Sequence, residues 1–372
     1  MAKFEQLRYN KLVVAMDSGI GEPVLGGQEM RRYTSLLLTA FALFLVVLCG
    51  SAYLAGADDA RKQRPMREVV AYTTLPAANV EILSTEYEKS SRVRVNFVPL
   101  SRTEILERFK EQNTGDAAIV LADRETLDEA SREGFFTPYV SEAGDAAADA
   151  FKHRDGLWTG VWYDPVVFCA NRDYLRQQMM IADTWVGLSE LNGARIGVTD
   201  FLAAEASANL LISMIGQYGD AAAYQIWRKI HPHVVQYAKY LNNPVRQAGM
   251  GEVDISVAVQ SEVLRYLNDG YPLKVIYPAD GTAYMLTGTG IAKSASAEQA
   301  AAAKEFADWL LSDEAQQALQ KNGFYFMPTN PATLAYKSFA GKNLVLFDQN
   351  VGFTPQERHE FLDRWVKYIR LR

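Results

Sequence analysis

The sequence predicts an α/β protein of two lobes, each a mainly parallel sheet flanked by helices. The chain has 372 residues, which is more than one hydrophobic core usually organises. Apolar residues make up 49% of it, which favours a globular protein over a disordered one. From residue 69 onward, strand-like segments alternate with helix-like segments, and parallel strands need such crossover connections. In sheets of this kind, ligands bind at the carboxyl ends of the strands.

The first predicted strand covers residues 69–72 and ends at Thr73 and Thr74, shortly before Pro76. Proline ends strand pairing because it has no N–H, and a helix can begin beyond it. A helix is expected over 77–90, where apolar residues recur on one face. Alternating apolar and polar residues then predict a strand over 93–97.

The next segments carry helix-end signals. Ser101 with Glu104 matches a capping box, which predicts that a helix begins there. A buried strand is expected over 117–121, and Asp123 then suits the N-cap of a helix that Gly134 ends. The first half of the sheet is therefore expected to have the order strand, helix, strand, helix, strand, helix.

The rest of the chain continues this alternation. Strands are expected over 158–163, 166–171, 195–198, 255–259, 273–277 and 287–292. Helices are expected over 202–217, from Asn243 as N-cap with Pro244 behind it, from Ser261, over 297–311, and from a capping box at Thr354 and Glu357 to about 367. The segments 273–277 and 287–292 are expected to return the chain to the first lobe. The first lobe is thus predicted over 66–165 with 274–330, and the second over 166–273 with 331–372.

An uncharged segment near the amino terminus indicates export. Residues 34–57 carry no charge, follow Arg31 and Arg32, and end in small residues before Asp58. Residues 30–57 therefore match a secretory signal cleaved after Ala57. The segment also reaches the roughly 20 residues that cross a bilayer, so an uncleaved anchor is the alternative. Residues 1–29 are expected to be a misannotated or cytoplasmic extension, and the rest to lie in the periplasm or on the outer face of the inner membrane.

Charge and cysteine content exclude some partners. The chain has 38 basic and 44 acidic residues and no basic block of the kind that follows a phosphate backbone, so nucleic acid is not expected as a partner. Its only cysteines are Cys49, in the apolar segment, and Cys169. No disulfide is therefore expected in the globular part.

Several short motifs, in this order, resemble the bacterial extracellular solute-binding proteins of the ferric-ion, thiamine, phosphonate and sugar-phosphate group. The resemblance covers residues 69–331. Its carriers are Tyr72-Thr73-Thr74, Gly134-Phe135-Phe136-Thr137-Pro138-Tyr139, Asp155-Gly156-Leu157-Trp158-Thr159-Gly160, Asn171-Arg172-Asp173-Tyr174-Leu175, Trp185-Val186-Gly187-Leu188, Ala194-Arg195-Ile196-Gly197, Gly251-Glu252-Val253-Asp254, Pro278-Ala279-Asp280-Gly281-Thr282, Leu311-Ser312-Asp313-Glu314-Ala315-Gln316 and Met327-Pro328.

This resemblance implies a type II periplasmic-binding-protein-like fold with a ligand cleft between two lobes, which close about a hinge. It also implies a monomer without a cofactor that delivers a small molecule to the permease and ATPase of an ABC importer. Catalysis is not expected, because the chain has no Gly-x-Ser-x-Gly elbow and no convincing metal triad.

One departure from the family bears on the ligand. The ferric-ion branch resembled here carries adjacent tyrosines as metal ligands, and this chain contains no Tyr-Tyr pair. A small anionic ligand, a phosphonate or sugar phosphate, is therefore preferred. The alternatives are a receptor for a ferric complex, thiamine or a polyamine, and a membrane-tethered domain that senses its ligand.

Candidate ligand-binding residues follow predicted strands. Thr73 and Thr74 offer hydroxyl and N–H groups to an anionic oxygen, or form only a turn. Asp123 is a second candidate, expected at the end of the third strand, although helix capping is the commoner role of such an aspartate. Ser207 lies near the start of a helix, where free N–H groups attract phosphate, but it can also serve packing alone.

Further candidates come from the second half of the chain. Gln260 and Ser261 follow a buried strand, and Asp280 and Thr282 lie in a turn before the return crossing. Trp158, with Trp162 and Tyr163, offers an apolar wall, although core packing is the commoner role of aromatic residues.

Two other patterns are expected to have no special function. His231 and His233 lack a clear third ligand, so no metal site is expected. The segment 288–294 has no glycine directly before Lys293, so it is interpreted as a strand and its exit rather than a phosphate loop.

Overall fold

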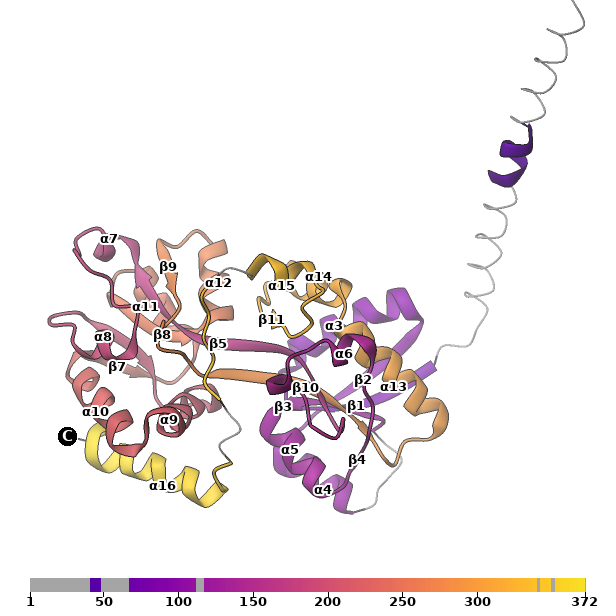
Figure 1. Ribbon diagram of the computed structural model, residues 1–372, viewed down its shortest axis with the longest axis horizontal. Coiled ribbons are helices and arrows are strands. Elements are labelled where there is room, and N and C mark those ends of the chain that lie inside the picture. Colours follow the sequence, from indigo (N-terminus) through magenta and orange to yellow (C-terminus); the bar gives the residue numbers. More distant parts are fainter. Residues whose placement is uncertain (1–40, 48–66, 112–116, 340–341, 349–351, 372) are drawn as a thin grey trace, which may run out of the picture. The chain divides into compact units, whose positions relative to one another are not determined.

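The computed structural model describes residues 41–47, 67–111, 117–339, 342–348 and 352–371 (Figure 1). Contacts divide the chain into two units, Met1–Pro65 and Met66–Arg372. In the first unit, residues 41–47 are helical and exposed. No helix within the described ranges has both the length and the apolar character that a membrane span requires. Most of the predicted signal or anchor, and the extension 1–29, lie outside the described residues.

In the first lobe, the strands run in the order β2-β1-β3-β10-β5. Strand β1 pairs in parallel with β2 and β3, whereas β10 is antiparallel to β3 and β5. Two short strands, β4 and β11, pair with β10 and β5. The bounds are β1 Arg67–Thr73, β2 Val93–Pro99, β3 Ile119–Asp123, β4 Phe136–Thr137, β5 Thr159–Asn171, β10 Tyr284–Ala292 and β11 Met327–Pro328.

Strand β5 runs through both lobes as one buried segment of 13 residues, although two separate strands are expected from the sequence. Its first part pairs with β10 as far as Pro165, and its second part pairs with β8 from Val166 onward. The partner therefore changes at the proline, which has no N–H to donate to a ladder. This explains why Pro165 does not end the strand.

In the second lobe, β6 pairs in parallel with β7 and β8, and β5 is antiparallel to β8 and β9. The bounds are β6 Ile196–Thr199, β7 Val234–Ala238, β8 Ile255–Val259 and β9 Leu273–Ile276. Of the two segments expected to return to the first lobe, β9 stays on β5 in the second lobe and β10 makes the return. The residue boundaries of the lobes remain a prediction.

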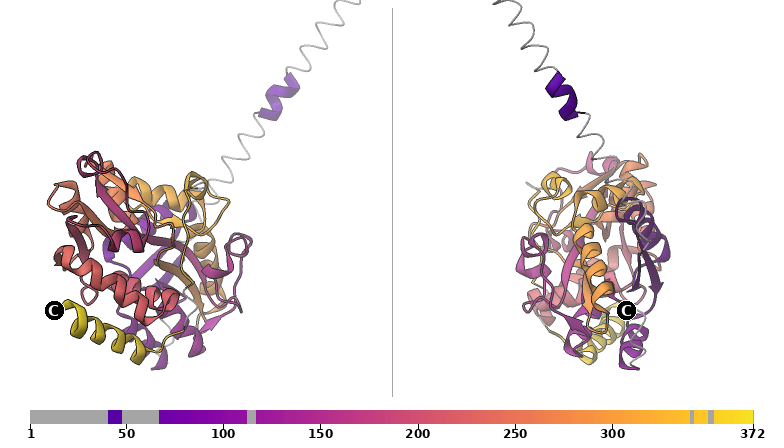
Figure 2. Two further views of the ribbon diagram at one scale, coloured as in Figure 1. Left: turned by 60° about the vertical axis from the view of Figure 1, so that its left-hand side comes forward. Right: turned by 90° about the vertical axis from the view of Figure 1, so that its right-hand side faces the viewer.

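Helices lie on both faces of each strand group (Figure 1 and Figure 2). In the first lobe, one face packs against α3, α13 and α14, and the other against α4 and α5. In the second lobe, α8, α9, α10 and α16 cover one face, and α11 and α12 the other. The bounds are α3 Ala77–Ser91, α4 Arg102–Lys110, α5 Arg124–Arg132, α6 Glu142–Asp145, η2 Asp149–Phe151, α7 Arg172–Leu175, α8 Trp185–Ser189, α9 Glu205–Tyr218, α10 Asp220–Ile230, η3 His231–His233, α11 Asn242–Gly249, α12 Gln260–Asn268, α13 Ala297–Leu310, α14 Asp313–Lys321, α15 Leu334–Phe339, α16 Pro355–Trp365 and η4 Val366–Arg370.

The helix-end predictions are confirmed at four positions. Ser101 and Thr354 each form a capping box, at α4 and α16. The Asp123 carboxylate accepts the N–H of Thr126 at 2.8 Å and caps α5. Gly134 follows α5 with φ +76°, the left-handed conformation that favours glycine. Strong local signals therefore fixed these ends.

Three other helix-start predictions were wrong. Helix α11 begins at Asn242, two residues before the predicted first residue Pro244, so Asn243 is inside it and does not cap it. Ser261 is the second residue of α12, because its hydroxyl bonds Asp164 instead of its own helix. Helix α9 starts at Glu205 rather than 202, because a turn closed by the Ala203 N–H and the Asp200 carbonyl, at 2.9 Å, precedes it.

Candidate functional site

A cleft of about 620 Å³ is lined by residues of both lobes. Helices α4 and α5 contribute from the first lobe, and α9 and α16 from the second (Figure 1). Its charges are balanced in number: it is lined by the basic residues Arg102, Arg124, Arg132 and Arg358 and by the acidic residues Glu125, Asp128, Glu129 and Asp348. A small polar ligand would therefore meet both guanidinium and carboxylate groups in this cleft.

The closest ion pair across the cleft joins Arg102, the first residue of α4, to Glu205, the first residue of α9, at 2.5 Å. The same guanidinium lies 3.7 Å from Asp123. Both contacts use one terminal nitrogen of Arg102. The buried Nε of Arg102 has no hydrogen-bond partner among the described residues.

A second set of contacts across the cleft centres on Glu125 of α5. Its carboxylate accepts a hydrogen bond from the Asn209 side-chain amide at 3.0 Å and lies 3.8 Å from the guanidinium of Arg358. Arg358 also donates to the carbonyl oxygen of the Asn209 side chain. Residues of α5, α9 and α16 therefore form one polar network.

Three carboxylates meet where these two sets of contacts adjoin. Oxygens of Asp123, Glu125 and Glu205 lie within 4.8 Å of one another. Partial desolvation, followed by the charges of Asp123 and Glu125, raises the pKa of Glu205 to about 7, although its side chain is still 42% exposed and Arg102 and Arg358 oppose the shift. Burial and the Asp123 charge also raise the pKa of Glu125. The cluster therefore favours protonation of Glu205 and Glu125 more than isolated carboxyls would.

The same three carboxylates form a group large enough to ligate a metal, but their surroundings do not fit that role. The Arg102 guanidinium already neutralises an oxygen of Glu205, and Arg358 lies near Glu125. Because each guanidinium stays charged, a metal ion would have to displace Arg102 from the Glu205 oxygen that it needs as a ligand. We therefore assign no metal to this cluster.

The far end of the cleft is built around Arg124. Its guanidinium lies 3.4 Å from Asp128 and 5.8 Å from the ring centre of Trp158. The Trp158 indole N–H donates to Asp128 at 2.9 Å. Trp158 is only 2% exposed, so it supports the Arg124 and Asp128 side chains from the core.

The sequence-predicted residues at the first-lobe strand ends lie close together. The buried Thr73 hydroxyl donates to the Leu121 carbonyl at 2.7 Å. The Thr74 hydroxyl accepts the N–H of Asp123 at 3.2 Å. These contacts tie the ends of β1 and β3 together and place Thr74 beside Asp123, near Arg102.

In the second lobe, Ser207 lies in the first turn of α9, as expected. Its hydroxyl donates to the carbonyls of Asp200 and Ala204, at 2.8 and 2.7 Å. Ala204, the N-cap, makes no side-chain hydrogen bond to the helix. Ser207 also borders a recess of about 20 Å³ with Thr199.

Gln260 and Ser261 form another polar cluster, at the start of α12. The Ser261 N–H donates to the Asp164 carboxylate at 2.9 Å, and Tyr277 donates to the Gln260 side-chain oxygen at 2.7 Å. Gln260 is fully buried, and in the described part of the chain its amide nitrogen has no partner.

The remaining predicted residues make structural contacts. The Asp280 carboxylate accepts the Trp185 N–H at 2.9 Å, and the buried Thr282 hydroxyl donates to the Val166 carbonyl at 2.8 Å. Trp162 and Tyr163 are buried in the core. None of the nine predicted ligand-binding residues is among those that line the 620 Å³ cleft, and their role toward a ligand remains a prediction.

Two patterns set aside in the sequence are described by the structure. His231 bonds the Tyr237 hydroxyl at 2.8 Å, and neither His231 nor His233 belongs to a group of three metal-ligand residues within the described ranges. The segment 288–294 is the end of β10 and its exit, as interpreted from the sequence.

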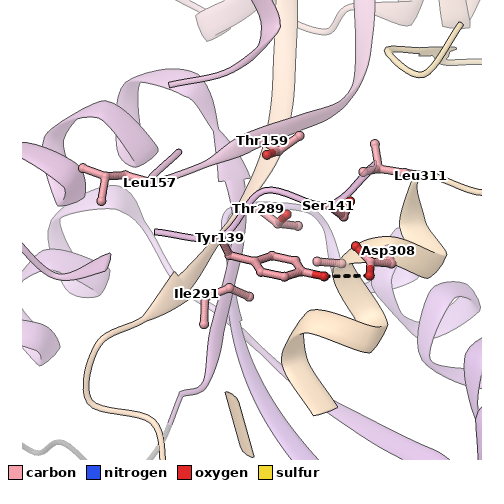
Figure 3. A pocket seen from close by; sticks show the side chains of 9 residues that line it. Tyr139, Ser141, Leu157, Thr159, Thr289, Ile291, Asp308 and Leu311 are labelled. Atoms are coloured by element: carbon pink, nitrogen blue, oxygen red, sulfur yellow. Dashed lines mark hydrogen bonds between the residues drawn. The ribbon is translucent and has the colours of Figure 1, made fainter. Parts of the chain in front are cut away.

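The first lobe also contains a small pocket of about 10 Å³ (Figure 3). The Tyr139 hydroxyl points at Asp308 and donates to it at 2.7 Å, and Thr159, Thr289 and Ser141 lie nearby (Figure 3). The other Asp308 oxygen has no partner in the described structure. The volume suits about one water molecule.

Sequence reasoning missed Arg102, Glu125, Glu205, Asn209 and Arg358. Arg102 directly follows the predicted cap Ser101, and Glu125 follows the predicted cap Asp123 by two residues. A search for charged residues in the first turn of helices that follow strands would have found these two. Nothing in the sequence pairs Arg358 with Glu125, because they are 233 residues apart.

Comparisons with known proteins agree with this architecture. The periplasmic binding protein AfuA from Actinobacillus pleuropneumoniae, described with fructose-6-phosphate bound, superposes with a TM-score of 0.65 at 22% identity over 83% of this chain and 100% of its own. Iron-bound HitA from Pseudomonas aeruginosa superposes with a TM-score of 0.66 at 15% identity over 80% of this chain and 98% of its own. These likenesses show the type II periplasmic-binding-protein fold.

The sequence comparisons identify the family. Iron uptake protein A1 of Synechocystis is 22% identical over 336 residues, 83% of this chain and 91% of its own. An uncharacterized protein of Haemophilus influenzae is 26% identical over 256 residues, 65% of this chain and 73% of its own. The family model for the bacterial extracellular solute-binding protein matches residues 83–344. The chain therefore belongs to the family of bacterial extracellular solute-binding proteins.

Proposed function

We propose that this protein captures a small ligand with a phosphoryl group, a phosphonate or sugar phosphate, and delivers it to the permease and ATPase of an ABC importer. It acts in the periplasm or on the outer face of the inner membrane, as a monomer, and catalyses no reaction. Family membership supports the transport role, and the fructose-6-phosphate described for AfuA is a precedent for a phosphoryl ligand on this fold.

The ligand class is inferred from the hydrogen-bond partners of the Arg102 guanidinium. One terminal nitrogen is shared by Glu205 and Asp123, whereas the buried Nε is unpartnered among the described atoms. A buried donor without an acceptor costs stability. A phosphoryl group offers two oxygens in the geometry that binds a guanidinium in a bidentate way. Such a ligand would satisfy both nitrogens at once.

The start of α9 supports the same ligand class. The N-cap Ala204 supplies no side-chain acceptor, so the first N–H groups of this 14-residue helix have no side-chain cap. The Thr199 hydroxyl, 3% exposed, has no partner within the described structure and lies beside this turn in the 20 Å³ recess. Free N–H groups at a helix start favour an anion.

The nine ligand-binding residues predicted from the sequence have different roles in this proposal. Thr74 and Asp123 lie next to Arg102, and Ser207 lies in the first turn of α9, so these three are placed to border a phosphoryl group. The Gln260 amide nitrogen has no acceptor among the described residues, so it is a free donor for a ligand in this proposal. Thr73, Ser261, Asp280, Thr282 and Trp158 are proposed to position these groups through the contacts described above.

Thermal-shift screening of the full-length chain with phosphonates and sugar phosphates tests the proposal, because a ligand that binds only the folded state stabilises it. At least one compound is expected to stabilise the wild type. Arg102→Gln should bind that compound about ten- to a hundredfold more weakly, since it removes charge-assisted hydrogen bonds. The control is Arg94→Gln, whose side chain pairs with Glu88 on the first-lobe surface at 3.0 Å. No stabilisation by any phosphoryl compound would contradict the proposal.

The carboxylate cluster favours a second candidate, a ligand with an amine such as thiamine or a polyamine. Asp123, Glu125 and Glu205 could pair with a cationic group. In that case thiamine or spermidine would stabilise the wild type and phosphoryl compounds would not.

Two further alternatives are tested separately. A ferric complex, for which the iron-binding relatives are precedents, is included as a ligand in the same thermal-shift screen. A membrane-tethered sensor requires an uncleaved segment, so a mature protein beginning at Asp58 would exclude it.

A further inference from the structure

The contact between Arg102 and Glu205 joins the two lobes at the point where an anionic ligand is proposed to bind. Glu205 is the first residue of α9, and its carboxylate lies 2.5 Å from the guanidinium of α4. A carboxylate at the start of a helix interacts favourably with the helix dipole, as a bound anion does. Glu205 therefore takes the place that a ligand oxygen would need on Arg102.

The cluster around Glu205 is short of positive charge. Three carboxylates, Asp123 and Glu125 from the first lobe and Glu205 from the second, come within 4.8 Å of one another. Two guanidiniums, Arg102 of α4 and Arg358 of α16, face them. On α9 the neighbouring polar side chain is the neutral Asn209. Bringing the lobes together thus gathers one more negative charge than positive charge.

We propose that Glu205 couples ligand capture to the uptake of a proton: when an anion binds, Glu205 releases Arg102 to the anion and becomes protonated. The coupling rests on the proposed function for its ligand. The effect of pH on contact between the lobes does not rest on it, because that effect depends only on the three carboxylates that meet there. Glu205 is thus a specificity-determining residue, because its ionised carboxylate competes with an anionic ligand for Arg102 and weakens binding of that ligand.

The sign of the pH effect follows from linkage. With the lobes in contact, the pKa of Glu205 is about 7, against an ordinary value of 4.5. The form with the higher pKa binds the proton more tightly, so protons favour lobe contact. Between about pH 4.5 and 7 the ratio of joined to separated lobes should rise as pH falls, by up to about tenfold per pH unit for one proton. Above pH 7 it should level off.

Lobe separation can be measured without any ligand. Spin labels on Met180→Cys, 84% exposed in the second lobe, and Lys89→Cys, exposed in the first, report the distance between lobes in the full-length chain in mild detergent. Cys49→Ser removes the competing thiol outside the described residues, and Cys169 is fully buried. The wild type should shift toward the shorter distance from pH 7.5 to 5. Glu205→Gln, which is neutral at every pH, should lose most of this shift.

The matched control is Glu190→Gln, which removes one carboxylate that lies 3.7 Å from Lys229 within the second lobe. It should keep the wild-type shift. A shift that is unchanged in Glu205→Gln, absent in the wild type, or reversed in direction would overturn the proposal. These distance measurements use no ligand. A thermal-shift screen in which no phosphoryl compound binds would therefore contradict the proposed function and leave the pH effect on lobe contact untouched.

The ligand component is tested by calorimetry of fructose-6-phosphate binding at pH 7.5 in two buffers with different ionisation enthalpies. Titration of the ligand itself contributes equally to wild type and variant, so the difference reports the protein. The wild type should take up more protons per ligand than Glu205→Gln, and the variant should bind more tightly, by several-fold, because the competing carboxylate is gone. Equal proton uptake in both proteins would overturn this component.

Discussion

The Asp164 carboxylate accepts hydrogen bonds from both the backbone N–H and the hydroxyl of Ser261. These two bonds join the middle of β5 to the first turn of α12. Asp164 lies one residue before Pro165, where β5 changes its partner from β10 to β8. The carboxyl is 7% exposed, and burial raises its pKa to about 7, although the hydrogen bonds from Ser261 oppose this shift. The segment that crosses between the lobes thus contains a buried acid that titrates near neutral pH.

The Asp164→Asn variant should make folding stability less dependent on pH. An acid whose pKa is higher in the folded protein stabilises it fully below its ordinary value, here 3.8, and this stabilisation is lost as pH rises through about 7. The asparagine oxygen can still accept the Ser261 N–H. Between pH 5 and 8, the wild type should lose about 2 kcal/mol more unfolding free energy than the variant.

Urea unfolding at both pH values measures this difference. Asp173→Asn is the control, since Asp173 is 66% exposed and pairs with Arg176 on the surface. An Asp164→Asn variant that loses as much stability as the wild type would show that the carboxyl is not protonated at pH 5 in the folded state.

Asp280→Ala should reduce stability and leave ligand affinity nearly unchanged. The Asp280 carboxylate accepts the N–H of Trp185, the first residue of α8, so it adds a distant acceptor to the cap that the Thr184 hydroxyl makes with the Gly187 N–H. Loss of such a cap costs about 1 kcal/mol. Urea unfolding and titration with the best phosphoryl compound measure the two effects separately. A large loss of affinity with unchanged stability would instead give Asp280 a direct role in binding.

The sequence was sufficient to predict elements whose signals are local. The capping boxes at Ser101 and Thr354 and the glycine at residue 134 lie where the structure has helix ends, because side chains within four residues determine them. The continuity of β5 was not predictable from Pro165, because it depends on which strands pair on either side.

The candidate site shows the same division. Ser207 was correctly placed at a helix start, but its hydroxyl is used by the Asp200 and Ala204 carbonyls. The ion pair of Arg102 with Glu205 joins residues 103 positions apart, and each is an unremarkable first-turn residue by itself. The folding of the chain brings Arg102 and Glu205 together, and the periodicity of apolar residues in the sequence does not predict such a contact.

Gly288→Ala should destabilise the protein, because β10 and β5 approach closely there. A Cβ at residue 288 would lie 2.6 Å from the Thr159 carbonyl oxygen and 3.0 Å from the Gly160 Cα, both backbone atoms. The two strands would have to separate, with a cost of about 1 to 3 kcal/mol. Gly352→Ala, where no atom lies within 4 Å of the added Cβ, should change little. Similar unfolding midpoints for both variants in urea would show that the strands can separate at little cost.

Trp227→Ala should produce one of the largest losses of stability in the second lobe. Trp227 is fully buried on α10, where its ring centre lies 4.7 Å from that of Phe201, 5.9 Å from Trp185 and 6.1 Å from Trp365. These rings join α8, α10 and α16, so truncation leaves a cavity between three helices. A buried tryptophan replaced by alanine costs about 3 to 5 kcal/mol. The exposed Tyr240→Ala, at 59% exposure, should cost less than about 0.5 kcal/mol.

The Trp227→Ala substitution should loosen α16. Because α16 contributes Arg358 to the cleft, Trp227→Ala should also weaken the Arg358 contact with Glu125, and amide exchange in α16 should rise more than in α3. Equal rises in both helices would mean that the tryptophan cluster does not fix α16 specifically.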